Sequence, residues 1–216
     1  MSSPQKSWRE FAKTLAEHPS TRDVRPVILE SWRRSRAAGV RRHNEKPLLH
    51  RISAADFDYQ LEKNRELIQL GGPLLQEFSA AQQIRHVLYI TDRDGIVLYS
   101  VGDDIWRAMF GLMPGFDWSE NTMGTNGAGT ALATNQPVAV VGPDHFVSAF
   151  ETTTCLACPI RTRNGTLLGA VDFSTTVEDA RVEQLSEIIE LAHRIEHALH
   201  AKGSNAGFRT PFDVVE

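Results

Sequence analysis

The sequence lacks the features that mark an exported or membrane-bound protein. Its 216 residues include only two cysteines, and no stretch approaches the roughly 18 consecutive apolar residues that a membrane-spanning helix needs. The first residues, from Met1 to Lys6, begin no apolar segment of the kind found in a secretory signal. We therefore expect a protein of the reducing cytoplasm that makes no contact with a membrane.

The common catalytic motifs are also absent. The sequence contains no GxSxG, HExxH or GxxxxGK[ST] pattern, which argues against the usual serine hydrolases, zinc proteases and P-loop nucleotide hydrolases. The glycines between positions 111 and 129 do not have the spacing of a dinucleotide-binding fingerprint. We expect neither a catalytic residue nor a cofactor nor a bound metal. The 41% hydrophobic and 23% charged residues are typical of a globular protein.

Positive charge is concentrated near the N-terminus, although the net charge of the chain is −4. From Arg22 to Arg51, nine Lys and Arg residues stand against three Asp and Glu residues. A solvated helix and loop is the plainer interpretation of the segment 22–51. Contact with an acidic partner or with DNA phosphates is the sharper one.

Helical patterns occupy the N-terminal third. Apolar residues three and four apart in 8–15 predict a first helix, and a second should begin near Pro26 and stop near Gly39. A long helix is expected to begin after a Ser53 cap. Residues 71–73, Gly-Gly-Pro, should break or kink it, because proline removes a hydrogen bond and glycine is a poor helix former.

The centre of the chain is rich in β-forming residues. Five such runs are separated by turn residues and span 86–91, 96–100, 137–141, 155–163 and 166–174. The turns at Asp92–Gly95 and Asn164-Gly165 predict two hairpins. Short helices are expected over Thr125–Thr134 and from Asp144 to Phe150. Strands joined by hairpins, with helices grouped around them, indicate an α+β fold.

A last helix is expected from Val177 to Lys202. Its apolar residues recur at the spacing of heptad a and d positions, and they are Leu185, Ile188, Ala192, Ile195 and Leu199. About two heptads are fewer than a coiled coil requires. A helix packed on its own sheet and a parallel helix pair in a dimer therefore both remain open.

Cys155 and Cys158 form a CxxC pair within a predicted strand. Residues three apart in a strand point to opposite faces, which disfavours a disulfide between them. A structural zinc site needs four ligands, and the sequence holds no second pair of cysteines. Buried structural cysteines are the plainer interpretation, and redox sensing or metal binding is the alternative.

The segment 116–132 has the composition of a ligand cavity. Trp118 offers an apolar wall with one hydrogen-bond donor. Thr125, Asn126 and Thr130 bring hydroxyl and amide groups to the start of a predicted helix, whose free N–H groups can face a polar ligand. The alternative is that glycine and threonine serve only tight turns and packing.

His145 lies between two predicted strands, beside Phe146 and Phe150. It could donate a hydrogen bond to a ligand in a mostly apolar pocket. The alternative is a structural histidine, partly buried and satisfied by its neighbours.

An ordered set of motifs resembles a known family. Its pieces are Val27–Ser35, Trp118–Asn126, Gly129–Leu132, Pro137-Val138, Asp144–Phe146, Thr154-Cys155, Cys158–Ile160, Gly165–Gly169 and Val171–Ser174. In this order they resemble the N-terminal GAF sensory region of bacterial sigma-54-dependent transcriptional activators of the acetoin-catabolism and dihydroxyacetone regulator type. Two positions depart from the family pattern: Asp144 replaces the usual Glu, and Gly127-Ala128 replaces Ala-Ile. The smaller pair could enlarge or loosen the pocket.

The resemblance implies an α+β, GAF-like antiparallel sheet of about five to six strands, with helices on one side and a pocket on the other. The patterns along the chain predict a basic helical extension over 1–52, a sensory domain with flanking helices over 53–202, and a flexible tail or linker over 203–216. The residues that match motif positions, or lie beside them, are candidates for ligand binding: Trp118, Thr125, Asn126, Thr130, His145, Phe146, Phe150, Cys155 and Asp172.

We therefore expect a homodimeric regulatory module that binds a small-molecule effector and passes the signal through its helices to transcriptional control. The usual ATPase and helix-turn-helix output regions of that family have no counterpart in this sequence, so an output domain or a separate regulator is an expected partner. Two alternatives remain. One is a thiol-dependent reductase on the same scaffold, using Cys155 and Cys158. The other is an interaction adaptor with an empty pocket.

Overall fold

The computed structural model describes residues 24–42, 49–181 and 183–205, apart from the side chains of 202–205. The helix expected over 8–15 and most of the expected tail lie outside these residues. Among the described helices, none is long and apolar enough to cross a membrane.

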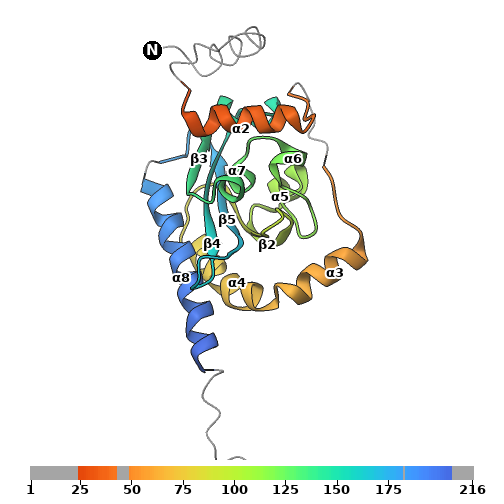
Figure 1. Ribbon diagram of the computed structural model, residues 1–216. Helices are drawn as coiled ribbons and strands as arrows, with labels where there is room; N and C mark the ends of the chain where they lie inside the picture. Colours follow the sequence, from red (N-terminus) through yellow and green to blue (C-terminus); the bar gives the residue numbers. More distant parts are fainter. Residues whose placement is uncertain (1–23, 43–48, 182, 206–216) are drawn as a thin grey trace, which may run out of the picture.

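A five-stranded antiparallel sheet forms the centre of the molecule, with the strand order β2-β1-β5-β4-β3 (Figure 1). The strands are β1 (His86–Asp92), β2 (Val97–Gly102), β3 (Val138–Val141), β4 (Thr153–Arg161) and β5 (Leu167–Thr176). Each coincides with a β-rich run of the sequence, and both hairpins are confirmed. The five-stranded α+β fold is therefore the one that the sequence predicts.

The β4–β5 hairpin turns at Asn164-Gly165, as expected, and Gly165 adopts a φ of +79°. Residues equidistant from this turn pair across the two strands, so that Cys155 lies opposite Ser174 and Ala157 opposite Asp172. β1 pairs with the other edge of β5 and places Tyr89 opposite Asp172. This register decides which side chains meet on each face of the sheet.

One face of the sheet, the outer face, is covered by α4 (Arg65–Ala80) and α8 (Glu183–Asn205) (Figure 1). The contact is apolar: Leu88, Ile90 and Phe173 from the sheet pack against residues of both helices. The expected heptad stripe of α8 lies in this contact, which supports a helix packed on its own sheet. Because those residues pack against the sheet of their own chain, they cannot also form the seam of a parallel helix pair.

α8 begins later than predicted, at Glu183 and not at Val177. Thr176 and Asp179 form a turn that delays it: the Thr176 hydroxyl donates to Asp179 Oδ2, and the Asp179 amide donates back to Thr176 Oγ1 at 3.0 Å. Such local hydrogen bonds compete with helix formation. α8 also extends past the expected end at Lys202.

α3 (Ala54–Lys63) begins after Ser53, whose hydroxyl accepts a hydrogen bond from the Asp56 amide, as predicted. The break between α3 and α4 falls at Asn64, and α4 continues through residues 71–73, contrary to expectation. Pro73 lies on the exposed side of α4, where water can satisfy the carbonyl that loses its partner. The two glycines are buried instead against the sheet and its neighbours.

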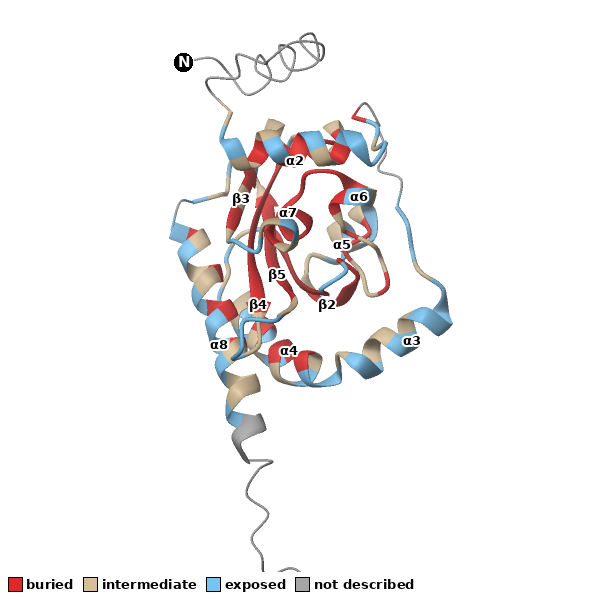
Figure 2. Cartoon of the chain, viewed as in Figure 1, coloured by how far each residue is buried: buried red, intermediate tan, exposed pale blue. Residues whose placement is uncertain are grey.

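The opposite face, here called the inner face, is also covered, in contrast to the open pocket side that the resemblance implies. The elements that pack over it are α2 (Pro26–Ala37), α5 (Asp104–Phe110), α6 (Glu120–Met123), α7 (Gly127–Thr134) and the loop 142–151. α2 lies across one end of the sheet, over α6 and α7 (Figure 1). Figure 2 shows that the strands between the two layers are almost entirely buried.

The helix expected from Asp144 to Phe150 is not formed. Two short 3-10 turns, Gly142–Asp144 and Ser148–Phe150, stand in its place, with His145 between them. Arg42 explains the difference, because its guanidinium donates to the carbonyls of His145 and Phe146 at 2.7 and 2.8 Å. These carbonyls would otherwise accept the hydrogen bonds of a continuing helix.

Candidate functional site

Strand alternation places a set of polar side chains on the inner face. Tyr89, Cys155, Asp172 and Ser174 alternate with apolar residues that point to the outer face. All four are buried, and Tyr89 and Asp172 are completely so. His145 reaches them from the covering loop. We call these five residues the inner polar chain.

Hydrogen bonds connect most of this chain. The Ser174 hydroxyl donates to Asp172 Oδ1 at 2.8 Å, and its oxygen lies 3.3 Å from Cys155 Sγ. His145 Nδ1 lies 2.9 Å from the Gly142 carbonyl, which can only accept, so this nitrogen carries the proton. His145 Nε2 is then an acceptor, 3.3 Å from Cys155 Sγ, and the thiol is positioned to donate to it.

Burial shifts the pKa values of this chain towards the neutral forms of its members. It lowers the pKa of His145 to about 4 and raises the pKa of Asp172 to about 7. The pKa of the Cys155 thiol is raised well above its ordinary value by burial and then by the nearby Asp172 charge. An imidazole that titrates near pH 4 cannot deprotonate this thiol at neutral pH, so the pair is not an activated nucleophile.

Two polar atoms of the chain are unsatisfied. The Tyr89 hydroxyl and Asp172 Oδ2 are buried and make no hydrogen bond of normal geometry within the described residues, although they lie close enough to act on each other's pKa, and the Ala128 amide acts on that of Asp172. The two groups are neighbours: burial and then the Asp172 charge raise the pKa of Tyr89. Asp172 Oδ2 also lies against α7, where a Cβ added to Gly127 would stand 2.0 Å away. The Asp172 carboxylate thus fills the space that a side chain at position 127 would take, so Gly127 does not enlarge a pocket in this arrangement.

A second polar group lies between α2 and α7, and we call it the hydroxyl cluster. Glu120 Oε1 accepts hydrogen bonds from Ser31 and, at 2.7 Å, from Thr130. Ser31 Oγ also lies 2.7 Å from Thr125 Oγ1, whose hydroxyl can donate to it. Arg34 closes the cluster from the surface with two hydrogen bonds to Glu120, at 2.6 and 2.9 Å.

Asn126 separates the two groups and has a structural role. Its side-chain oxygen accepts from the Gly129 amide at 2.8 Å and so caps α7. Its side-chain nitrogen donates to the Trp118 and Gly124 carbonyls at 3.1 and 2.8 Å. These contacts hold the start of α7 in place and leave Asn126 little capacity for a ligand.

The predicted aromatic residues form apolar contacts around the polar groups. Trp118 donates to the Gly111 carbonyl at 2.9 Å, and its ring lies 5.2 Å from the Phe150 ring. Phe150 also packs beside His145, at 6.0 Å between ring centroids. Phe146 belongs to a separate cluster beneath α2. The nine predicted residues are therefore all buried, but they divide among several clusters.

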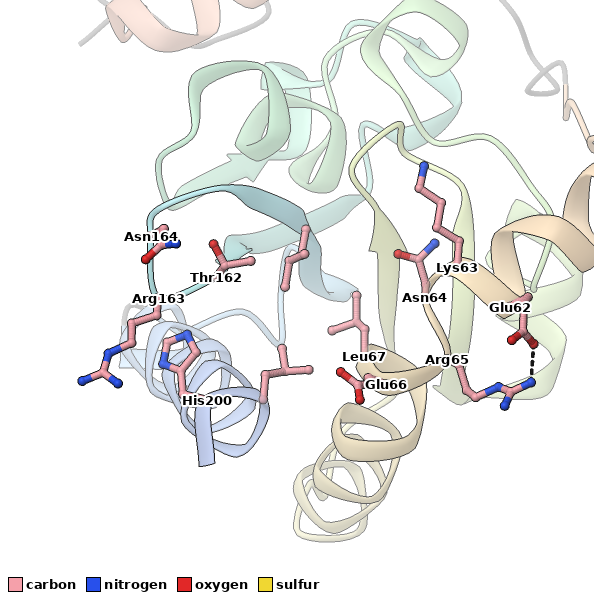
Figure 3. Close-up of a pocket in the computed structure, with 12 residues that line it drawn as sticks. Glu62, Lys63, Asn64, Arg65, Glu66, Leu67, Thr162, Arg163, Asn164 and His200 are labelled. Carbon is pink, nitrogen blue, oxygen red and sulfur yellow. Dashed lines mark hydrogen bonds and ion pairs between the residues drawn. The ribbon is translucent and has the colours of Figure 1, made fainter. Parts of the chain in front are cut away.

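The open cavities lie elsewhere. One of about 730 Å³ is bounded by residues 62–67, the β4–β5 turn and the last turns of α8, with Leu67, Glu66 and His200 among its lining (Figure 3). Another, of about 470 Å³, lies beside Arg34 and Glu120. None of the nine predicted residues lines either cavity. Their assignment to ligand binding stays a prediction.

The two cysteines lie on opposite faces of β4, as their spacing predicts. Cys155 belongs to the cluster beneath α2, and Cys158 to the apolar outer cluster. Both are buried and form no disulfide. Burial raises the pKa of Cys158 to about 11, so neither is a low-pKa thiol of the kind that reduction chemistry requires.

Sequence reasoning missed Ser174, Tyr89, Ser31 and Glu120. Ser174 could have been found, because it is equidistant with Cys155 from the Asn164-Gly165 turn. Tyr89 required the β1–β5 register, which no local motif specifies. Ser31 and Glu120 meet only because α2 folds back over α6.

Comparison with known proteins shows the family of this chain. The sequence matches the family described as the MimR N-terminal domain over residues 2–189. The chain belongs to this family.

Relatives of this MimR-type domain regulate transcription. The acetoin dehydrogenase operon transcriptional activator AcoR of Bacillus subtilis is 30% identical over 203 residues, which cover 91% of this chain and 33% of that protein. The propane 2-monooxygenase operon transcriptional activator MimR of Mycolicibacterium goodii is 30% identical over 184 residues, covering 82% and 30%. The chain thus spans about a third of the length of these relatives.

A solved structure has the same fold. In the complex of DhaR(N) with DhaL from E. coli, one chain superposes on the MimR-type domain with a TM-score of 0.79 and 21% identity, covering 84% of this chain and 63% of that one. The resemblance to sensory regions of transcriptional activators is confirmed. The chain is a regulatory domain of that class, and its relatives give no support to the reductase alternative.

Proposed function

We propose that this domain receives the signal for a transcriptional activator by binding a small neutral molecule at the inner polar chain. The single observation that carries the proposal is the pair of buried, unsatisfied atoms, the Tyr89 hydroxyl and Asp172 Oδ2. An unsatisfied buried polar group costs about 1–3 kcal/mol, so two neighbouring ones require an explanation. A ligand hydroxyl could donate to Asp172 Oδ2 and accept from Tyr89.

The surroundings favour a small, uncharged ligand. Trp118, Phe150 and Val147 contribute apolar surface on the same face, and burial disfavours the charged forms of His145 and Asp172 nearby. The relatives are named for operons of acetoin dehydrogenase and propane 2-monooxygenase. A C3–C4 alcohol, ketone or hydroxyketone combines this size with the required donor and acceptor.

The described arrangement is then a closed state. Asp172 Oδ2 is packed against α7, so the ligand must bind a state in which α7 or the covering segments have moved. A ligand shifts such an equilibrium only by its difference in affinity for the two states. The signal would leave through α8 towards the regions that the longer relatives possess, and the protein would act in the cytoplasm.

Binding of acetoin, 2-butanol and acetone, measured by calorimetry and by thermal shift, tests the proposal. We expect Asp172→Asn and Tyr89→Phe to weaken binding by about tenfold or more, because each removes a hydrogen bond in a desolvated site. Tyr99→Phe is the matched control: its hydroxyl bonds Gln76 at 2.7 Å, away from the inner face. Equal affinity in all three variants, or no binding by any of these compounds, would refute the site.

The homodimer remains a further proposal. The apolar stripe of α8 packs on the sheet, and the exposed side of this helix carries Glu190, His193, Arg194 and His197. A dimer must therefore use another surface than the expected heptad seam. Light scattering of the purified protein measures the oligomeric state directly.

An interaction module without a ligand is the second candidate. The close packing of the predicted pocket favours it, and the solved structure with this fold is a complex between DhaR(N) and DhaL. The basic segment is a poorer candidate for contacting a partner or DNA than its charge suggests. Arg25, Arg33, Arg34 and Arg42 all pair with acidic residues of this chain.

A further inference from the structure

Residues 25–42, comprising α2 and the segment that follows it, lie across one end of the inner face, over α6 and α7. We call them the cover. Ile28 and Trp32 are completely buried and pack in one cluster with Cys155, Ala131 and Phe146. The cover therefore lies directly over the end of the inner polar chain where Cys155 and His145 meet.

Three side chains of the cover hold the loop 142–151 in place. Arg25 pairs with Asp144 at 2.8 Å, and the Trp32 indole donates to the Asp144 carbonyl at 2.6 Å. Arg42 donates to two carbonyls of the loop and pairs with Glu151. The loop that carries His145 is thus fixed largely by side chains of the cover, and the two would move together.

The contact between the cover and α6 is centred on one ion pair. Glu120 is 6% exposed, whereas Arg34 is 39% exposed, and the two make a bidentate contact. The cavity of about 470 Å³ lies beside this pair, which gives the Arg34 side chain room to swing into solvent. Arg34 can recover hydration when it leaves, but Glu120 then retains, among the described side chains, the hydroxyls of Ser31 and Thr130.

We infer that the cover is a releasable lid over the ligand site and that the Arg34–Glu120 ion pair is its latch. Release of the latch frees α2 and the loop 142–151 together, and it exposes Cys155 and His145 while the outer face stays packed. This inference rests on the proposed function for its purpose, since a closed site needs a route of entry. The opening itself can be measured without any ligand.

The two cysteines provide the test. Cys155 lies beneath the cover, and Cys158 lies on the opposite face of the same strand. The native protein is labelled with a thiol reagent, and the modification rate of each cysteine is followed by peptide mass spectrometry. Labelling of a buried thiol follows the population of the open state when opening and closing are fast. Cys155 therefore reports opening of the lid, and Cys158 reports unfolding of the domain.

Arg34→Gln should raise the labelling rate of Cys155 by about tenfold or more, because it removes two charge-assisted hydrogen bonds to a buried carboxylate. The rate at Cys158 should stay within about twofold. Arg33→Gln is the matched control, one residue away on the same helix, since Arg33 pairs only with exposed Glu30 among the described residues. It should change neither rate.

Equal acceleration at both cysteines in Arg34→Gln would indicate global destabilisation and would overturn the lid. An unchanged Cys155 rate would overturn the latch. Ser31→Ala, which removes a smaller part of the same contact, should raise the Cys155 rate by less than Arg34→Gln does. Failure of acetoin to bind would leave these rates unaffected, so the lid and the proposed ligand site can fail separately.

Discussion

The two faces of the sheet differ sharply, although the same strands build both. On the outer face, Leu88, Val171 and Phe173 pack against α4 and α8 in an apolar cluster. On the inner face, their neighbours Tyr89, Asp172 and Ser174 form hydrogen bonds or lie unsatisfied. Strand alternation lets the chain separate two tasks: one face supplies stability, and the other carries polar groups that reduce it.

This division predicts where substitutions should act on folding and where they should act on pH response or opening. The outer face should behave as an ordinary core, with losses that follow buried apolar volume. The inner face should respond to pH, because burial shifts the pKa values of His145 and Asp172 away from their ordinary values. The following predictions test this contrast, from the largest expected effect to the smallest.

Phe173→Ala should lower the free energy of unfolding by about 3–5 kcal/mol. Phe173 is 1% exposed. Its ring stacks on the His86 ring, with 5.3 Å between centroids, and meets the Phe78 ring edge-on, with 6.1 Å between centroids. Ser174→Ala, the next residue on the inner face, is the comparison and should cost about 1 kcal/mol. Urea unfolding measures both, and a smaller loss in Phe173→Ala than in Ser174→Ala would contradict the division.

Asp172 and His145 should give the domain two opposing pH dependences. The pKa of Asp172 rises from 3.8 to about 7 on folding. The folded state then holds a proton that the unfolded state has lost, so this carboxyl makes stability fall as pH rises from 4 to 7. The pKa of His145 falls from 6.5 to about 4. Only the unfolded state binds that proton, so the imidazole makes stability rise over pH 4 to 6.5.

In the wild-type protein the two slopes largely cancel between pH 4 and 6.5. Asp172→Asn should uncover the histidine slope, with stability rising on the order of 3 kcal/mol from pH 4 to 6.5. His145→Gln should uncover the opposite slope, falling by a similar amount up to pH 7. Thermal or urea unfolding across this pH range measures both. Parallel curves for the three proteins would show that neither group is buried in the state described.

Gly127→Ala should destabilise the domain by about 1–3 kcal/mol, because the added Cβ would lie 2.0 Å from Asp172 Oδ2 and 2.7 Å from Cys155 Cβ. Gly72→Ala is the matched change in α4. There the nearest atoms outside the neighbouring residues belong to the Tyr99 ring at 3.6 Å, but Pro73 disfavours a Cβ on the helical residue before it, so the change should be nearly neutral. Asp172→Ala should recover part of the loss in the Gly127→Ala background. Equal effects of the two glycine substitutions would contradict the close approach of α7 to Asp172.

Most of the fold is readable from the sequence because its signals are local. Turn residues at Gly95 and Gly165 specify two hairpins, and Ser53 specifies the start of α3. The errors arise where a distant contact overrides a local preference. Arg42 takes the carbonyls that a helix from Asp144 would use, and α4 tolerates Pro73 because its exposed side is hydrated.

The candidate site is less readable for the same reason. The sequence indicates His145, Cys155 and Asp172 as interesting residues, and the structure brings them together. It also indicates Asn126, whose hydrogen bonds turn out to cap α7. The residues that complete the polar groups, Tyr89 and Glu120, depend on sheet register and on the return of α2. Such long-range contacts leave no trace in spacing or composition.

The smallest predicted effect compares the two cysteines, which share a strand and differ only in the face they occupy. Cys158→Ser places a hydroxyl among Ile160, Val171 and other apolar residues, with the Pro159 carbonyl 3.5 Å from Cys158 Sγ as its one recorded acceptor among the described residues, and should cost about 1–3 kcal/mol. Cys155→Ser places the same group within 3.3 Å of His145 Nε2 and of Ser174 Oγ, where it gains hydrogen bonds and should cost less than about 1 kcal/mol. The two substitutions remove the same sulfur and add the same oxygen, so the difference between their unfolding free energies isolates the environment. Equal losses would mean that the inner face is no better suited to polar groups than the outer one, and the reason for placing a ligand there would fall with it.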